Sequence, residues 1–228
     1  MIHQFIFAVP KPNLPAEAFQ SYWVNFHAVE YAKKIPQIRQ YLVATRVHVP
    51  YAREIPAFEG VAEIWLANEE EQIASLQTPE FLNGARLDEP RWAAFWQTLV
   101  LDTDPHVIRA CSGGLREFTK VYVLVKRSPT MELRAFQEHI TSGAHCATVT
   151  ALPGIRGHLI GLARPGLYGL GEPRFDAVEV WSFEDAAAAG SALAGDAVTA
   201  VARSWSEFAD ARYIFTFVGR EHWILPPG

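Results

Sequence analysis

The pattern of apolar and polar positions runs twice through the same order of predicted elements. Each pass opens with a strand of β-branched and aromatic residues, continues with a helix that a proline turn ends, and adds two strands, a region of Ala- and Glu-rich helices and a last strand. The predicted ranges are 2–9, 13–34, 38–48, 61–66, 69–76, 91–101 and 106–109, then 119–126, 130–151, 155–162, 177–181, 184–194, 197–208 and 213–218. The order β-α-β-β-α-β is the ferredoxin-like arrangement.

Short motifs recur in the same order and at nearly the same spacing, which indicates a duplicated domain. The matching segments are Ala18-Phe19-Gln20 with Ala135-Phe136-Gln137, Ile35-Pro36-Gln37-Ile38-Arg39 with Leu152-Pro153-Gly154-Ile155-Arg156, Glu63-Ile64-Trp65 with Glu179-Val180-Trp181, and His27 with His145. We predict two units, at residues 1–110 and 115–228, joined at the small residues Ala110-Cys111-Ser112-Gly113-Gly114.

A ferredoxin-like sheet covers one face with its helices and leaves the other face bare and apolar, which a lone copy does not tolerate. The predicted fold class is therefore α+β, with two tandem ferredoxin-like βαββαβ units whose sheets pack into one intrachain α+β barrel. The expected assembly is a monomer with an internal pseudo-dimer, or a homodimer.

Strand alternation predicts which side chains face the barrel. On the first strands of the two copies we expect His3, Phe5 and Phe7, and Lys120, Tyr122 and Leu124, to face it. On the third strands we expect Glu63, Trp65, Glu179 and Trp181. On the second strands we expect Arg39, Tyr41, Arg156 and His158. The predicted interior is thus aromatic and carries carboxylates, arginines and an imidazole.

Composition excludes several classes of function. The chain has 228 residues and a formal net charge of −5, so nothing favours nucleic acid as a partner. No basic run suggests a membrane surface, and no apolar stretch suggests a membrane span or a signal peptide. We expect a cytoplasmic protein with two reduced cysteines, Cys111 and Cys146. No metal-binding spacing is present, so no metal site is expected.

These motifs resemble the EthD family of the dimeric α+β barrel superfamily. The resemblance rests on Phe19, Tyr22, Trp23, His27, Pro36, Arg39, Glu63 and Trp65 in the first copy and on Phe136, His145, Pro153, Gly154, Arg156, Glu179 and Trp181 in the second. The second copy departs from the pattern where His139 and Ile140 replace Tyr22 and Trp23. The resemblance implies a small-molecule enzyme with its site inside the barrel or between sheet and helices.

The candidate catalytic residues are His145, His158, Glu179, His27 and Glu63, because imidazoles and buried carboxylates carry protons near neutral pH. The candidate substrate-binding residues are Tyr41, Arg39, Trp65, Tyr122, Arg156, Trp181, Phe5 and Phe7. The structural alternative is that each Glu pairs with the Arg of its own copy and that the histidines link helix to strand. Because His158 replaces Tyr41 in the repeat, we place the reaction centre in the second copy.

The leading hypothesis is a cofactor-independent enzyme that performs His/Glu acid–base chemistry, such as dehydration, isomerisation or cyclisation, on a small apolar or aromatic substrate. The resemblance to the EthD family implies a substrate of a polyketide-like or catabolic kind. One alternative is a cofactor-free monooxygenase, and another is a non-catalytic protein that binds a hydrophobic ligand. No cofactor is expected, with haem held by a histidine as the remaining alternative.

Overall fold

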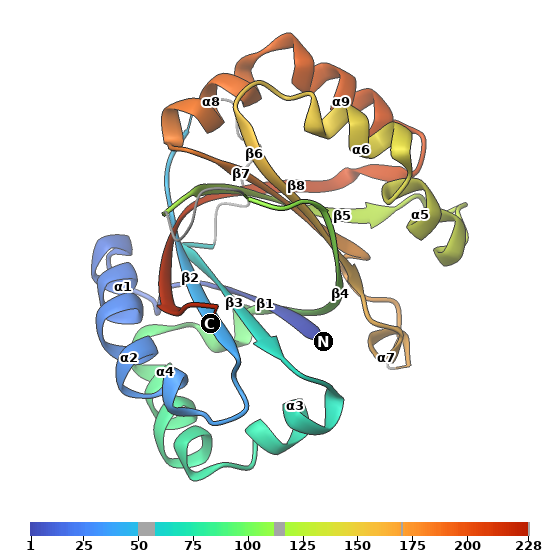
Figure 1. The fold of residues 1–228 in the computed structure, drawn as a ribbon. Helices are drawn as coiled ribbons and strands as arrows, with labels where there is room; N and C mark the ends of the chain where they lie inside the picture. Colours follow the sequence, from blue (N-terminus) through green and yellow to red (C-terminus); the bar gives the residue numbers. More distant parts are fainter. Residues whose placement is uncertain (50–57, 112–116, 170, 228) are drawn as a thin grey trace. The chain divides into compact units, whose positions relative to one another are not determined.

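A computed structural model of the chain describes residues 1–49, 58–111, 117–169 and 171–227. These residues form two compact units, each discontinuous in sequence. The first unit holds the described residues of 1–46, 58–102 and 221–227, and the second holds those of 47–49, 103–111, 117–169 and 171–220. The protein is a mixed α+β chain with antiparallel sheets (Figure 1). Most of the predicted joint, at 112–114, lies outside the described residues.

The first unit is built on an antiparallel sheet in the order β1–β3–β2. Its strands are β1 (Ile2–Ala8), β2 (Gln40–Arg46) and β3 (Gly60–Leu66), and β4 (Leu99–Arg109) starts in this unit and continues in the second. In the register, Ile6 lies opposite Ala62, and Tyr41 lies opposite Ile64. Apolar side chains therefore gather on one face of this sheet.

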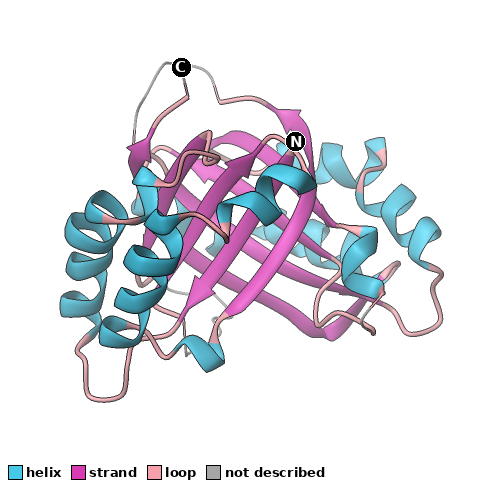
Figure 2. Cartoon of the chain, turned by 90° about the horizontal axis from the view of Figure 1, so that it is seen from below, coloured by secondary structure: helices cyan, strands magenta, loops and turns pink. Residues whose placement is uncertain are grey.

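The helices of the first unit cover that face. Figure 2 shows helices (cyan) lying against strands (magenta). Those of the first unit are α1 (Ala16–Tyr22), the π-helix η1 (Trp23–His27), α2 (Ala28–Glu30), the 3₁₀ helix η2 (Ala32–Lys34), α3 (Glu69–Ser75), the π-helix η3 (Phe81–Ala85), α4 (Arg86–Trp92) and the 3₁₀ helix η4 (Phe95–Gln97). The core joins Phe19, Trp23 and Trp92 from the helices to Ile2 and Ala62 from the strands.

The second unit is built on an antiparallel sheet in the order β8–β5–β7–β6–β4. Its strands are β5 (Thr119–Arg127), β6 (Ile155–Ala163), β7 (Ala177–Phe183) and β8 (Ala209–Leu225), of which the last ends in the first unit, together with the second part of β4. Val123 lies opposite Glu179, and His158 lies opposite Trp181. This register decides the site described below.

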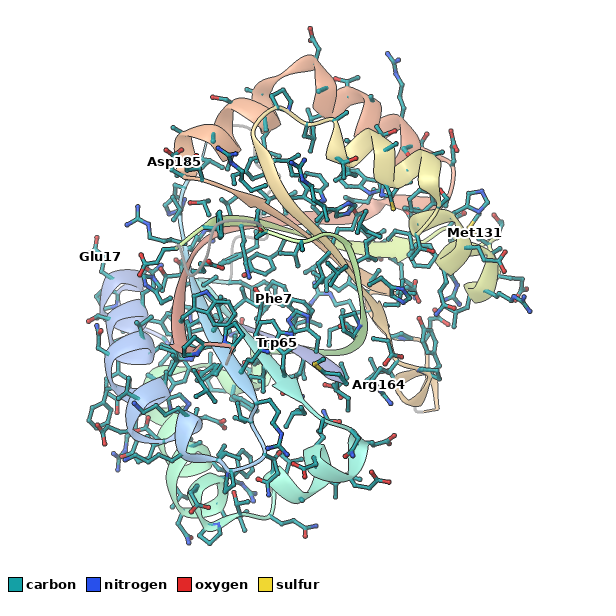
Figure 3. All side chains as sticks on the ribbon, viewed as in Figure 1. Phe7, Glu17, Trp65, Met131, Arg164 and Asp185 are labelled. Atoms are coloured by element: carbon teal, nitrogen blue, oxygen red, sulfur yellow. The ribbon has the colours of Figure 1, made fainter. Side chains whose placement is uncertain are left out.

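Helices again cover one face of this sheet. They are α5 (Leu133–Ile140), α6 (Gly143–Thr150), α7 (Pro165–Tyr168), α8 (Ala186–Ala194) and α9 (Asp196–Ser206). Side chains cap two of them, because the first N–H groups of a helix have no partner within it. Ser142 Oγ accepts a hydrogen bond from the His145 N–H at 3.3 Å, and Asp185 (Figure 3) accepts one from the Ala188 N–H at 2.8 Å.

The strands predicted from the sequence are all present, and the largest difference lies at 91–101. This segment was predicted to be helical, whereas α4 ends at Trp92 and β4 begins at Leu99. A short apolar run such as Leu99–Leu101 does not distinguish a buried helix from a strand. The ferredoxin-like description of each copy, the division at 1–110 and 115–228 and the closure of one barrel stay predictions.

Within the described part of the chain, no helix has the length and apolar character needed to cross a membrane.

Candidate functional site

A cavity of about 610 Å³ lies in the first unit, between its sheet and its own helices. Its walls are mainly apolar, and a few polar side chains reach it. The lining residues that matter below are Trp23, His27, Tyr41, Ala62, Ile64, Glu89 and Trp92. A cavity of this size and character is typical of a small-molecule site, where a few polar groups orient a largely apolar ligand.

Two π-helices shape this cavity. Trp23 and His27 belong to η1, and Phe81 and Ala85 belong to η3; all four line the cavity. A π-helix shifts the side chains that follow it relative to an α-helix, and such segments occur frequently at functional sites. Gly60 lets the Trp23 ring lie close to the sheet, because a Cβ at this position would lie 2.6 Å from the ring.

His27 and Asp88 form a buried pair at the cavity wall. His27 Nδ1 lies 2.9 Å from Asp88 Oδ2, and Asp88 also accepts a hydrogen bond from the Tyr22 hydroxyl at 2.8 Å. Arg91 lies 3.6 Å from the same carboxylate. These contacts favour a carboxylate that accepts the Nδ1 proton, which leaves the lone pair on His27 Nε2. Among the described residues, Nε2 has no hydrogen-bond partner, so a ligand in the cavity can approach it.

Burial lowers the pKa of His27, and the Asp88 carboxylate only partly offsets that effect. The imidazole is therefore neutral at neutral pH and able to accept a proton. The ring is also held in place, since it packs on Trp92 with 4.7 Å between ring centroids.

Two further polar groups reach the cavity. The Tyr41 hydroxyl accepts a hydrogen bond from Trp23 Nε1 at 3.1 Å, and no acceptor for its own proton is found among the described residues. Burial raises the pKa of Tyr41, so it stays a phenol that can donate to a ligand oxygen. Burial also raises the pKa of Glu89 to about 7, so this side chain exchanges a proton near neutral pH.

The second unit holds a different cluster around Glu179, which is fully buried. Its Oε1 accepts hydrogen bonds from His145 Nε2 at 3.0 Å and from Trp205 Nε1 at 2.8 Å. Its Oε2 accepts from His158 Nε2 at 3.3 Å and from Trp181 Nε1 at 3.2 Å. Burial raises the pKa of Glu179, but the hydrogen bonds from the two histidines outweigh burial and hold the pKa well below its usual range.

This cluster lies under the helices of the second unit, which corrects the predicted orientation of Glu179, Trp181 and His158. Glu179 pairs with Val123, and both His158 and Val121 pair with Trp181, so all share the helix-covered face. The prediction aligned Glu179 with Glu63. In the structure, the counterpart of Glu179 is Ala62, because Ala62 pairs with Ile6 as Glu179 pairs with Val123. A register error of one residue moves every side chain to the opposite face.

The arginines are not interior either. Arg39 is exposed and pairs with Glu71 at 3.1 Å, and Arg156 is exposed and pairs with Glu184 at 2.7 Å. The structural alternative, in which Glu63 and Glu179 pair with these arginines, is therefore wrong. Tyr41 was also expected on the face opposite the helices, and it lies on the helix-covered face.

The other face of the first sheet carries the residues predicted for it. Glu63 Oε2 lies 2.8 Å from His3 Nε2, and both side chains are buried. The His3 ring stacks on Trp65, with ring centroids 4.2 Å apart. Phe7 and Trp65 project from the strands on the side away from the helices of this unit (Figure 3).

Phe5 is buried on that same face, and Tyr122 is buried on the corresponding face of the second sheet, alternating with Val121 and Val123. Substrate-binding roles for these residues stay predictions. Among the described residues, no three His, Cys, Asp or Glu side chains are grouped as metal ligands would be.

Sequence reasoning brought together His145, His158 and Glu179 but missed Asp88, Glu89 and Trp92. These three lie in α4; Asp88 and Glu89 fall in the stretch between 76 and 91 that was left without a predicted element, and Trp92 falls in the range 91–101 that was predicted to be helical but given no role in the site. A signal for two of them is present in Asp88-Glu89, a pair of adjacent carboxylates between the apolar Leu87 and Pro90. Neither of the two cavities described in this structure is lined by His145, His158 or Glu179.

Fold and cavity together define an α+β protein with a ligand-sized cavity between a sheet and its own helices. Residues 11–95 match the family model of the EthD domain, which confirms the resemblance for this part of the chain. The matched range includes His27, Tyr41, Asp88 and Glu89. EthD character of the second copy stays a prediction. No curated protein matches the sequence at a significant level.

Solved structures share the fold along almost the whole chain. An anthrone oxidase-like protein is 11% identical at a TM-score of 0.66, over 98% of this chain and 92% of that one. A protein proposed to be a monooxygenase, from Fusobacterium nucleatum, is 9% identical at a TM-score of 0.62, over 98% and 92%. A chlorite dismutase mutant from Candidatus Nitrospira defluvii is 10% identical at 0.54, over the same shares. At these identities the likeness shows the fold, and a fold hosts many activities.

Proposed function

We propose that this chain is an enzyme that removes a proton from a small, apolar or aromatic substrate bound in the cavity of the first unit. The observation that carries the proposal is the His27–Asp88 pair, buried at the wall of an apolar cavity that His27 lines, with no hydrogen-bond partner for Nε2 among the described residues. A base held by a carboxylate, with its reactive nitrogen facing the substrate, is a recurring arrangement in enzymes.

In the proposed reaction, three residues of the cavity have separate roles. His27 Nε2 takes the proton, and the electron pair of the broken bond moves toward a neighbouring substrate oxygen. Tyr41 donates a hydrogen bond to that oxygen and stabilises its charge. Glu89, with its pKa near 7, returns a proton to a second atom of the substrate, which completes an isomerisation or releases water in a dehydration. This chemistry needs no cofactor.

A cofactor-free monooxygenase is the second candidate, and the names of two structures of similar fold favour it. The same deprotonation would yield a carbanion that reacts with O₂. One oxygen atom enters the substrate as a carbonyl, and the other leaves as water with the two protons of the original CH₂ group. Proton abstraction by His27 is common to both candidates. The site residues of the second copy stay a further hypothesis, without a described cavity to serve them.

Anaerobic hydrogen–deuterium exchange tests the shared step. Anthrone, an aromatic ketone with an acidic CH₂ group, is incubated with the protein in D₂O, and NMR follows loss of the CH₂ signal above the rate in buffer. His27→Gln should lower the protein-dependent rate by about 10²- to 10⁴-fold. His139→Gln is the matched control, because His139 is exposed on α5 and bonds only to the Ala135 carbonyl among the described residues.

An equal rate in His27→Gln and His139→Gln, with both variants folded, would reject His27 as the base. Admitting O₂ then separates the two candidates. Oxygen uptake with formation of the ketone at the CH₂ carbon indicates the monooxygenase, and exchange without uptake indicates acid–base chemistry alone. Tight binding of anthrone without exchange in the wild-type protein would favour the hydrophobic-ligand binding protein.

A further inference from the structure

A second cavity, of about 520 Å³, lies in the second unit and differs in character from the first. Four basic side chains line it: Lys126 and Arg127 at the end of β5, Arg174 in the segment before β7, and Arg212 on β8. Glu172 and Asp210 are its acidic lining residues. We name this cavity the basic groove.

Two of the cations in the basic groove are held from behind by a buried carboxylate. Asp176 has no exposed side-chain surface, and its oxygens lie 3.0 Å from Lys126 Nζ and 2.6 Å from Arg127 Nη1. Arg127 Nε also donates to the Met131 carbonyl at 3.1 Å, and Lys126 Nζ donates to the Pro173 carbonyl at 2.9 Å. Both cations are therefore fixed before any ligand arrives, which reduces the entropic cost of binding.

Glu172 shows what kind of group these cations accept. Its side chain is about half exposed, and its two oxygens receive Arg127 Nη1 at 2.8 Å and Nη2 at 3.1 Å. Lys126 Nζ contacts the same carboxylate. This fork-like contact, completed by an ammonium, is the geometry with which proteins bind carboxylates and phosphates. Glu172 is the exposed partner of two largely buried cations that also keep their contacts with Asp176, so a ligand anion can take its place without leaving either cation unpaired.

The remaining cations extend the basic groove beyond Glu172. Arg174 is exposed, lies over the Phe175 ring at 5.5 Å, and has no carboxylate partner among the described residues. Arg212 donates to both oxygens of Asp210, from Nε at 3.0 Å and from Nη2 at 2.7 Å. A ligand with two or more negative charges fits this arrangement better than a monoanion, because one group can take the place of Glu172 while another reaches Arg174.

We propose that the basic groove binds a small polyanion through a phosphate or carboxylate group that displaces Glu172 from Arg127 and Lys126. All of its residues lie in the second unit. The site is therefore separate from the cavity that holds His27, and its failure would leave the proposed enzymatic function untouched.

Calorimetric titration of the full-length protein with pyrophosphate, at low and at physiological ionic strength, tests the proposal. Glu172→Gln removes the competing carboxylate and should tighten binding about threefold to tenfold. Glu184→Gln is the matched control, since it makes the same change in net charge at an exposed carboxylate that pairs with Arg156 outside the basic groove. Arg174→Gln should weaken binding by a similar factor.

Citrate, titrated in parallel, tells a carboxylate ligand from a phosphate ligand. The group that the basic groove recognises is that of the probe, citrate or pyrophosphate, which binds more tightly and whose affinity changes in Glu172→Gln. The proposal is overturned if neither probe gives saturable binding at millimolar concentration. It is also overturned if Glu172→Gln and Glu184→Gln bind alike, because affinity would then follow net charge alone. Circular dichroism and thermal melting confirm that each variant is folded.

Discussion

Glu179 offers the sharpest test of the second unit, because its carboxylate accepts four hydrogen bonds away from water. The change Glu179→Gln keeps the shape and replaces one oxygen with an NH₂ group that cannot accept. The two donors on that side, one indole and one imidazole, then lose their acceptor. An imidazole can move its proton to the other nitrogen and accept instead, whereas an indole cannot.

The expected loss follows from this count. One stranded indole N–H costs about 1–3 kcal/mol, and loss of a second, charge-assisted bond adds about 1–2 kcal/mol, for a loss of about 2–5 kcal/mol in the free energy of unfolding. Urea unfolding followed by circular dichroism measures it. The near-ultraviolet signal of the stacked Trp181–Trp205 pair, 5.7 Å apart and nearly parallel, reports on the cluster directly. Glu184→Gln should change stability by less than about 0.5 kcal/mol.

The stability that Glu179 contributes should also depend on pH. Because the pKa of folded Glu179 lies below its ordinary value of 4.5, its contribution is fully present above pH 4.5 and is lost as the pH falls toward the folded pKa. The carboxylate's share of the difference between wild type and Glu179→Gln should therefore be complete at pH 7 and shrink as the pH falls below 4.5. A difference no larger than that of Glu184→Gln at pH 7 would refute the view that this carboxylate locks the helices to the sheet.

Three further predictions concern other positions. Glu89→Gln should stabilise the protein by roughly 1–2 kcal/mol at pH 8 and should not stabilise it at pH 4. The reason is that a pKa of Glu89 raised to about 7 makes the stability of the wild-type protein fall as the pH rises from 4.5 to 7. Urea unfolding at pH 4 and at pH 8 checks this. Gly60→Ala should cost about 1–3 kcal/mol and weaken binding of 2-naphthol in the cavity, measured by fluorescence, since its Cβ would overlap the Trp23 ring. Arg39→Gln and Arg156→Gln should each lower the free energy of unfolding by less than about 1 kcal/mol, because both arginines form exposed pairs; a larger loss in thermal or urea unfolding would restore an interior role.

The sequence by itself determined the α+β class and the places of the strands along the chain. These follow largely from local properties: β-branched and aromatic runs favour strands, and the proline turns at Pro36 and Pro153 follow the first helices of the two copies. It also identified the EthD resemblance of the first copy and the buried character of Glu179. This residue is polar within an apolar pattern, which the chain tolerates only when hydrogen-bond partners are supplied.

Tertiary structure alone decided which face each strand presents and where a cavity remains. Glu-x-Trp occurs in both copies, yet Glu63 faces away from the helices of its unit and Glu179 lies beneath those of its own. Aligned by the motif, Glu179 corresponds to Glu63, whereas aligned by strand register it corresponds to Ala62, one residue earlier. Register is fixed by pairing with distant strands. Where the first copy has the small Ala62 and the Ile64 side chain, the second has Glu179 and Trp181.

Only packing of those side chains against the helices determines whether the space is filled or left open for a ligand. In the second copy the indoles of Trp181 and Trp205 and the carboxylate occupy it, and in the first copy it stays open beside His27 and Asp88. Asp88 comes from a segment far along the chain from His27, and hydrophobic periodicity carries no information on such a pair. The chemistry of the site therefore depends on contacts that form only when the chain has folded.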